Sequence, residues 1–278
     1  MVTHVTAPTA ALLDALPDWV TLLRAPNPGP MTLDGTNTWV LRTGADEPAV
    51  IIDPGPLDEG HLATVVGHAP VGFILVTHGH HDHVEGAARL SEMLGGVPVL
   101  AAAPAHCVGT EPLDPDEALS AGDLMIEALS TPGHTADSVT FLVRVGEEEV
   151  VFSGDTILGR GTTIVAWPDG DLGDYLASLR TLRGLGPVPV LPGHGPALAD
   201  CAAAAGYYLD HRLARLEQVR TARVAGARTA EEVVRVVYAD VDPVLWPAAE
   251  WSVRAQLAYL ENMERRESQP GSAELDEP

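Results

Sequence analysis

The sequence predicts an α+β fold, in which a layered domain of strands and helices precedes a small helical module. Short apolar runs bounded by Gly and Pro recur through the first two hundred residues, and many are rich in Val and Ile, as buried strands tend to be. Stretches with helical spacing alternate with these runs. After Pro196 the strand pattern stops and nearly continuous helical periodicity follows.

The layered domain is expected to span residues 1–204. Its strands are predicted at Trp19–Leu23, Thr38–Arg42, Ala49–Ile52, Phe73–Val76, Val97–Ala101, Leu124–Leu129, Val139–Val145, Val150–Phe152 and Val188–Leu191. The segment Gly146-Glu147-Glu148 is typical of a hairpin turn between two of these strands. Helices are predicted at 60–68, 84–95 and 171–184.

The helical module is expected to span residues 205–266. Its first helix is indicated by leucines at helical spacing, Leu209, Leu213 and Leu216. Thr229 and Glu232 form a capping-box pattern that predicts the start of a second helix, and a third is predicted after Pro247. Residues 267–278 are acidic and too polar to bury a core, so we expect a disordered tail.

Composition argues against a membrane-spanning, secreted or disulfide-stabilised protein, and it limits where a nucleic acid could bind. The formal charge is −23, and only residues 205–266 could offer the basic patch that nucleic-acid binders usually show. No apolar stretch approaches the roughly 20 residues needed to span a bilayer, and the N-terminus does not resemble a secretory signal. Cys107 and Cys201 do not make a disulfide framework. We therefore expect a cytoplasmic protein with no membrane partner.

A concentrated group of metal-binding side chains follows the strand predicted at Phe73–Val76. The group consists of His78, His80, Asp82 and His83. Uncharged imidazole and carboxylate oxygen are ligands that suit zinc and neighbouring divalent ions. Sheets flanked by helices place their sites at strand ends, where this group stands. The group therefore predicts a metal site.

Three further candidate ligands also follow apolar runs, and each is preceded by a glycine. They are His134, Asp155 and His194. Seven ligand-type residues from four strand ends suit two metal ions with a carboxylate that bridges them. Zn(II) is the expected metal, although the same nitrogen and oxygen ligands also serve Mn(II) and Fe(II).

Four motifs occur in order along the chain: Thr-His-Gly-His-His-Asp-His, Pro-Gly-His-Thr, Ser-Gly-Asp-Thr and Pro-Gly-His-Gly. Together they resemble the metallo-β-lactamase superfamily. The resemblance implies an αβ/βα sandwich with a dinuclear centre at one edge. It assigns His78, His80 and His134 to the first metal, Asp82, His83 and His194 to the second, and Asp155 to the bridge.

A metal-held hydroxide is the expected nucleophile, because a bound divalent ion lowers the pKa of water from about 15.7 toward 7. Asp82 is predicted to be catalytic as well as a ligand, since a free carboxylate oxygen could hydrogen-bond the nucleophile. The best-known zinc β-lactamases usually carry Cys where Asp155 stands, which disfavours antibiotic hydrolysis. A hydrolase of another kind is predicted.

A further resemblance extends to about residue 265. The segments 27–39, 154–163 and 191–196 are similar to those of the lactamase-beta-like protein 2 group, and the trailing helices are similar to the winged-helix-like module of that group. In that group the animal member is a single-strand-specific endoribonuclease. Fungal relatives are thioesterases that release acyl chains from a carrier domain.

Three functions therefore stay open. The first is hydrolysis of an ester or thioester in a small-molecule or carrier-bound acyl substrate. The second is cleavage of single-stranded RNA, and the third is a non-catalytic metal-binding role. A homodimer is compatible with each.

Substrate contacts are predicted in two loops. Asn37 could polarise a substrate oxygen, although loop 26–37 could equally be a turn that caps the following strand. Thr162 and Thr163 are expected to shape the pocket. An RNA substrate would need side chains that contact its phosphates. The helical module has four arginines that could form such a row of phosphate contacts, or that could simply be solvated on an exposed helix: Arg212, Arg215, Arg220 and Arg223.

Overall fold

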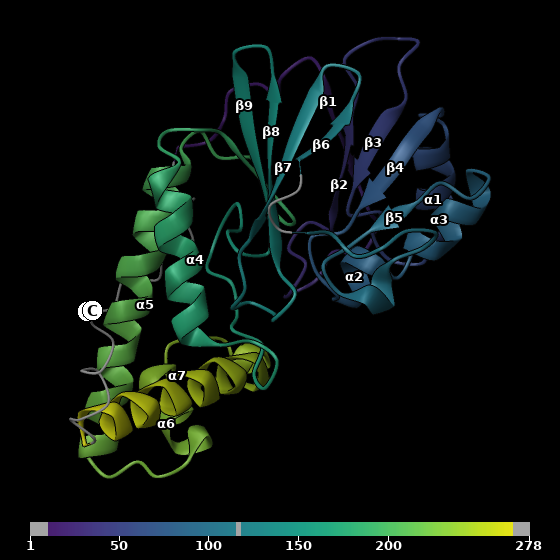
Figure 1. Cartoon of the computed structure of the whole chain (residues 1–278). Helices are drawn as coiled ribbons and strands as arrows, with labels where there is room; N and C mark the ends of the chain where they lie inside the picture. Colours follow the sequence, from purple (N-terminus) through teal and green to yellow (C-terminus); the bar gives the residue numbers. More distant parts are fainter. Residues whose placement is uncertain (1–10, 115–117, 269–278) are drawn as a thin grey trace, which may run out of the picture.

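Two five-stranded sheets stand face to face in the computed structural model, which describes residues 11–114 and 118–268 (Figure 1). The first sheet has the order β1 (Val20–Arg24), β2 (Asn37–Leu41), β3 (Ala49–Ile52), β4 (Val71–Leu75), β5 (Val99–Leu100). The second has the order β10 (Val190–Pro192), β9 (Glu148–Gly154), β8 (Val139–Val145), β7 (Leu124–Ser130), β6 (Ala118–Ala121).

Helices cover the outer face of each sheet (Figure 1). The first sheet carries α1 (Glu59–Val66) and α3 (Ala87–Met93), and the second carries α4 (Leu172–Gly184) and α5 (Cys201–Val224). The short α2 (His81–Val84) lies at one edge, and two single-turn 3-10 helices are η1 (Pro104–His106) and η2 (Pro243–Leu245). This arrangement confirms the predicted αβ/βα sandwich.

Central strands such as β3 are continuously apolar because both of their faces are buried. In β2, Trp39 and Leu41 pack into the core between the sheets, whereas Val40 packs under α1 and α3. Successive side chains of a strand point to opposite faces, so one strand supplies both cores. On the second sheet, Phe152 faces the first sheet and Val151 faces α4 and α5.

All nine predicted strands overlap observed ones, and β8 and β9 form the predicted hairpin, in which Val145 pairs with Glu148. Strand β6 was not predicted, because its sequence Ala-Leu-Ser-Ala has little apolar signal. The helix predicted at 84–95 is confirmed over α3, but its first residues are not part of that helix, since α2 and α3 are separate. They are divided at Gly86, where a Cβ would lie only 2.9 Å from the carbonyl oxygen of Pro56.

The trailing helices pack beside α4. Helix α6 (Ala230–Val237) begins with the predicted capping box of Thr229 and Glu232, and α7 (Trp246–Glu267) crosses near the ends of α4 and α5 (Figure 1). Helix α5 runs unbroken through the predicted boundary between residues 204 and 205. The predicted tail still contributes its first residue to α7, and from residue 269 it lies outside the described residues.

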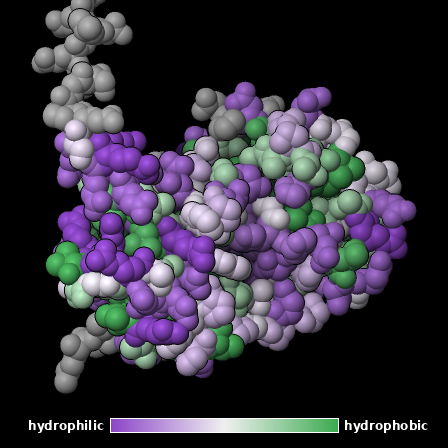
Figure 2. Space-filling model, turned by 90° about the horizontal axis from the view of Figure 1, so that it is seen from below, coloured by the Kyte–Doolittle hydropathy of each residue, from purple (hydrophilic) through white to green (hydrophobic). Residues whose placement is uncertain are grey.

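Hydrophilic side chains cover most of the lower face of the molecule, and its hydrophobic residues occur in small separate groups (Figure 2). Within the described part of the chain, no helix is both long enough and apolar enough to cross a bilayer. Cys107 and Cys201 are both free thiols, in line with the absence of a predicted disulfide framework.

Candidate metal centre

The seven predicted ligands meet at one edge of the sandwich, immediately beyond the ends of β4, β7, β9 and β10. The four strand ends come from both sheets, since β4 belongs to the first sheet and the other three strands belong to the second. The centre therefore lies where the two sheets meet. Its ligand atoms form two groups: His78, His80, His134 and Asp155, and then Asp82, His83 and His194.

In the first group, three imidazole nitrogens face one another. The Nδ1 atom of His80 lies 3.1 Å from Nε2 of His78 and 3.0 Å from Nε2 of His134. Two nitrogens bound at 2.0–2.1 Å to one tetrahedral zinc ion would be about 3.3 Å apart. The three nitrogens therefore have nearly the spacing of a ligand set.

The ligand atoms of the second group lie equally close to one another. Nε2 of His83 and Nε2 of His194 are 3.2 Å apart, and Oδ2 of Asp82 lies 3.0 Å from Nε2 of His194. Asp82 lies in α2 directly before His83, so one short helix supplies two of the three side chains.

Asp155 lies between the groups. One of its oxygens is 3.5 Å from Nε2 of His83, and the other is 3.8 Å from Nε2 of His134 and 3.5 Å from Nε2 of His194. The Oδ1 atom is buried and has no hydrogen-bond partner among the described residues. A buried carboxylate oxygen without a partner is costly, and a cation at this position would remove the cost.

In several of these histidines, the imidazole nitrogen that faces away from the centre (the outer nitrogen) makes a hydrogen bond to the protein. Nδ1 of His134 donates to the carbonyl oxygen of Ile164 at 2.6 Å, and Nδ1 of His194 is 3.3 Å from the carbonyl oxygen of Gly35. A hydrogen bond at the outer nitrogen fixes the tautomer, so that the lone pair of Nε2 points into the centre. These residues therefore fit divalent metal ions in both geometry and chemistry.

Asp53 is a site residue that the sequence analysis missed. It is buried, and its carboxylate accepts hydrogen bonds from Nδ1 of His83 at 2.8 Å and from the backbone and hydroxyl of Thr77 at 2.8 and 2.7 Å. A carboxylate behind a ligating imidazole orients the ring and raises its basicity. The sequence does contain a signal for Asp53. Like the ligands, it directly follows an apolar strand, β3, and it precedes the turn residues Pro54-Gly55.

The two groups differ in their electrostatic surroundings. Burial lowers the pKa of His134 to about 4, and burial together with neighbouring imidazoles lowers the pKa of His78 well below its usual value. Burial also disfavours charge on His83, but the carboxylates of Asp53 and Asp155 outweigh it and raise its pKa to about 10. His83 of the second group is therefore protonated in the metal-free protein, and binding of a metal ion would displace that proton.

Asp53→Asn is expected to weaken metal binding by roughly 10–100-fold, because the amide cannot support the His83 imidazole as a carboxylate does. The measurement is a competition titration of the metal-free protein against a chromophoric chelator. Asp18→Asn, at an exposed position before β1, is the matched control. Equal affinity in the two variants would show that Asp53 has only a structural role.

Asn37, predicted to contact substrate, supports the backbone near His194 in the structure. Its side chain is fully buried, and its amide nitrogen donates to the carbonyl oxygens of Pro192 and Gly195 at 3.0 and 2.9 Å. Its oxygen accepts a hydrogen bond from Nε of Arg24. Both hydrogen bonds of the amide nitrogen go to this backbone, so Asn37 holds the loop that carries His194.

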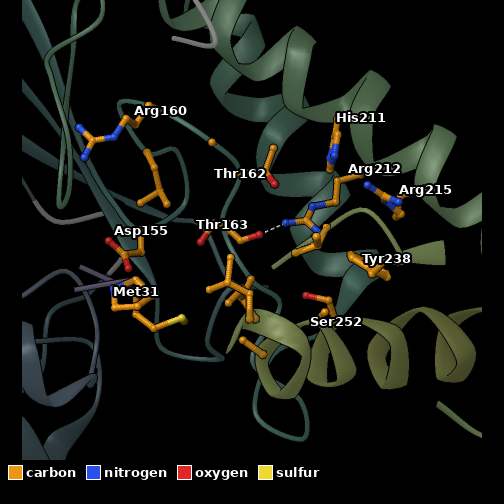
Figure 3. Close-up of a pocket in the computed structure, with 18 of the residues that line it drawn as sticks. Met31, Asp155, Arg160, Thr162, Thr163, His211, Arg212, Arg215, Tyr238 and Ser252 are labelled. Carbon is orange, nitrogen blue, oxygen red and sulfur yellow. Dashed lines mark hydrogen bonds between the residues drawn. The ribbon is translucent and has the colours of Figure 1, made fainter. Parts of the chain in front are cut away.

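A cavity of about 360 Å³ opens beside the centre, between the sandwich and the trailing helices (Figure 3). Thr162 and Thr163 line it, as predicted for residues that shape the pocket, and Met31 and Leu33 bring loop 26–37 to its rim. The hydroxyl of Thr163 is buried 3.3 Å from Nδ1 of His134, so this side chain also supports a ligand.

The predicted arginine track does not exist as one surface. Arg212 and Arg215 are buried and line the cavity, whereas Arg220 and Arg223 lie nearer the solvent and pair with Glu217 and Glu264 on the helix surfaces. The four share one helix, but successive turns of α5 present them to different surroundings. Spacing along the sequence could not reveal which face packs against the sandwich.

A comparison with known families agrees with this geometry. Residues 31–194, which include every predicted ligand, match the model of the metallo-beta-lactamase superfamily. The chain belongs to this superfamily. Residues 229–268 also match the beta-lactamase associated winged helix domain, which confirms the character predicted for the trailing module. As a superfamily member the chain is a hydrolase with a His and Asp cluster able to bind metal ions.

Several relatives resemble the chain over most of its length. It is 32% identical over 266 residues to a beta-lactamase-like protein 2 homolog of Caenorhabditis elegans, covering 90% of this chain and 83% of the relative. It is 33% identical over 235 residues to an atrochrysone carboxyl ACP thioesterase of Aspergillus chevalieri, covering 78% and 72%. A metallo-beta-lactamase family protein of Thermus thermophilus has the same fold, with a TM-score of 0.75, 24% identity and coverage of 90% and 95%.

Proposed function

We propose that this superfamily member hydrolyses a thioester or ester of a small-molecule or carrier-bound acyl group at a centre that holds two divalent ions, with zinc as the expected metal. The observation that carries the proposal is the cavity beside the ligands. His134 and Asp155 form part of its wall, so a group bound in the cavity lies against the centre. The similarity to a fungal thioesterase supports the same substrate class.

The lining of the cavity suits an acyl group. Its wall near the centre is formed by aliphatic side chains, including Leu33, Leu158 and Ile164. Binding of apolar atoms against such a wall removes them from water, which favours association. A cavity of about 360 Å³ lies within the range typical of small-molecule sites.

Divalent ions held by the seven residues would supply a water of lowered pKa and polarise the carbonyl oxygen of the substrate. In the reaction, the water oxygen bonds to the carbonyl carbon and the carbon–sulfur bond breaks. One proton of the water ends on the departing sulfur, so the products are a free acid and a thiol. An ester reacts in the same way and releases an alcohol.

Asp82 is the residue of the chain best placed to orient the attacking water. Its side chain is about one quarter exposed, more than those of His83, Asp155 and His194. One oxygen lies 3.0 Å from Nε2 of His194 and accepts a hydrogen bond from the hydroxyl of Thr36. Burial favours the neutral acid, but the charges of His83 and His194 hold the pKa of Asp82 well below its usual value, so it is an acceptor.

Cleavage of single-stranded RNA is the second candidate, and one observation favours it. Trp167 and Trp251, which are exposed, line a hollow beside His80. Exposed indole rings can stack on unpaired bases. The same hollow is lined by Asp137 and Asp169, however, and these carboxylates oppose a phosphate backbone. We therefore place this candidate second.

The experiment that separates the candidates compares two substrates with one metal-loaded preparation. We expect the full chain to hydrolyse acyl thioesters of N-acetylcysteamine and to leave a labelled single-stranded RNA intact. Thiol release and RNA length are the two readouts. RNA cleavage that is abolished by a chelator and weakened by salt, together with inert thioesters, would overturn the proposal.

A further inference from the structure

The cavity beside the metal centre has two chemically different ends (Figure 3). The near end is bounded by Asp155 and His134, by the polar side chains of Arg160 and Thr163, and by aliphatic side chains. The far end is formed by α5, the segment that follows α6, and α7, and the polar residues that line it include His211, Arg212, Arg215, Tyr238 and Ser252. An acyl group that enters with its carbonyl at the centre therefore meets polar side chains beyond its aliphatic part.

Two buried arginines dominate the far end. Arg212 is 3% exposed, donates to the carbonyl oxygen of Thr163, and has its guanidinium 5.3 Å from the ring centre of Tyr175. Arg215 is 9% exposed and donates to the carbonyl oxygen of Val237 at 2.7 Å. Arginine is seldom buried without a strong reason, because the charge must leave water.

The far end contains two buried nitrogen atoms that the described part of the chain leaves without a hydrogen-bond partner. Nε of Arg212 and Nδ1 of His211 are buried and have no partner among the described residues. Burial and the neighbouring arginines lower the pKa of His211 to about 4, so the ring is neutral and can present an N–H to an acceptor. Unpaired buried donors are costly, and an acceptor brought into the cavity would remove that cost.

The far end is also positively charged in a strongly acidic chain. Arg212 and Arg215 contribute two positive charges and Asp240 one negative charge, which leaves +1, whereas the whole chain carries −23. His211 adds no charge near neutral pH. One anionic group would therefore balance this wall.

We propose that the cavity binds the acyl part of the substrate and that Arg212 and Arg215 select an acyl chain ending in a carboxylate. This inference rests on the proposed hydrolysis of thioesters or esters. The planar guanidinium matches a carboxylate and forms charge-assisted hydrogen bonds with it. A chain that ends in a methyl group would leave Nε of Arg212 and Nδ1 of His211 without a partner.

The test uses the metal-loaded full chain and acyl groups matched in length on one thiol. Glutaryl, adipyl and suberyl thioesters of N-acetylcysteamine are compared with the pentanoyl, hexanoyl and octanoyl thioesters. We expect kcat/KM to be roughly tenfold or more higher for at least one carboxylate-ended substrate than for its methyl-ended partner, since a hydrogen bond to a charged group has that value. Because the thiol is constant, an anion site for the leaving group would show no such preference.

Variants assign the preference to the arginines. Arg215→Gln is expected to lose roughly tenfold on the carboxylate-ended substrates and less than about threefold on the methyl-ended ones. Arg212→Gln also removes the hydrogen bond to Thr163 beside His134, so it is expected to lose activity on both series, with the larger loss on the carboxylate-ended one. Arg220→Gln, on the outer surface of the same helix, is expected to change neither. Arg215→Lys keeps the charge and serves if Arg215→Gln is unstable by thermal melting. Equal losses on both substrate series, or a wild-type preference for methyl ends, would overturn the inference.

A binding measurement keeps this inference separate from the proposed reaction. Calorimetric titration of the metal-loaded protein with hexanoate and hexanamide should show tighter binding of hexanoate, lost in Arg215→Gln and retained in Arg220→Gln. If hexanoate binds in this way while no thioester or ester is hydrolysed, the carboxylate site stands and the proposed reaction fails. If hexanoate binding is the same in wild type and Arg215→Gln, the carboxylate bound elsewhere and the inference fails.

Discussion

Asp155→Ala is expected to lower kcat/KM on the best thioester substrate by roughly 10³-fold or more. Asp155 is the one described side chain whose carboxylate faces both ligand groups, within 3.5–3.8 Å of three imidazole nitrogens. Stabilisation of transition-state charge by a metal ion contributes several kcal/mol, and each 1.36 kcal/mol is a tenfold change in rate. Removal of the shared ligand therefore affects both halves of the centre at once.

Steady-state kinetics of Asp155→Ala with excess zinc measure this effect. Asp18→Ala, an exposed aspartate ahead of β1, is the matched control and should keep wild-type activity. Circular dichroism of the two variants establishes that the fold is intact. An Asp155→Ala protein that is folded and keeps more than about a tenth of the wild-type kcat/KM would show that this carboxylate does not join the two groups.

Gly133→Ala is expected to destabilise the protein by roughly 3 kcal/mol or more, the second largest effect that we predict. Gly133 has a φ of +130°, and a Cβ built on it lies 2.3 Å from both the nitrogen and the Cα of Tyr175. Those are backbone atoms of α4, so no side-chain rotation relieves the clash. Because Gly133 directly precedes His134, the displaced loop would also carry a metal ligand away from the centre.

Thermal melting of the metal-loaded protein measures this destabilisation. For a chain of this size a loss of roughly 3 kcal/mol lowers Tm by about 6–12 °C. Gly184→Ala is the control, because its Cβ meets no atom within 4 Å and alanine favours the helix. Similar melting temperatures for the two variants would mean that α4 can move away from the His134 loop at little cost.

The sandwich and the ligand groups could be predicted because their signals are local. His78, His134, Asp155 and His194 each stand within four residues of a strand end, and the other ligands follow His78 within five residues. The fold brings these strand ends together at one edge. His134 and Asp155 could therefore be found from the apolar run and the glycine that precede them. The strands that form the hydrophobic cores could be predicted for the same reason, since strands buried on both faces are continuously apolar.

The remaining parts depend on contacts between distant segments. Asn37 is polar and directly follows a loop rich in Gly and Pro, yet its partners are 155 and 158 residues away along the chain. Arg212 contacts Thr163, and only the packing of α5 against the sandwich shows that both face the cavity. Side-chain type alone does not distinguish a substrate contact from a support, or a solvated arginine from a buried one.

The number of metal ions bound per chain tests the central claim most directly. We propose that the seven side chains form one centre for two divalent ions, with three imidazoles on one side and Asp82, His83 and His194 on the other. The measurement is elemental analysis of the full chain after equilibration with zinc and removal of unbound metal. Two ions per chain, with thioester hydrolysis that is lost on chelation and restored by zinc, is the predicted result. A single ion per chain, or hydrolysis that survives complete chelation, would contradict the account.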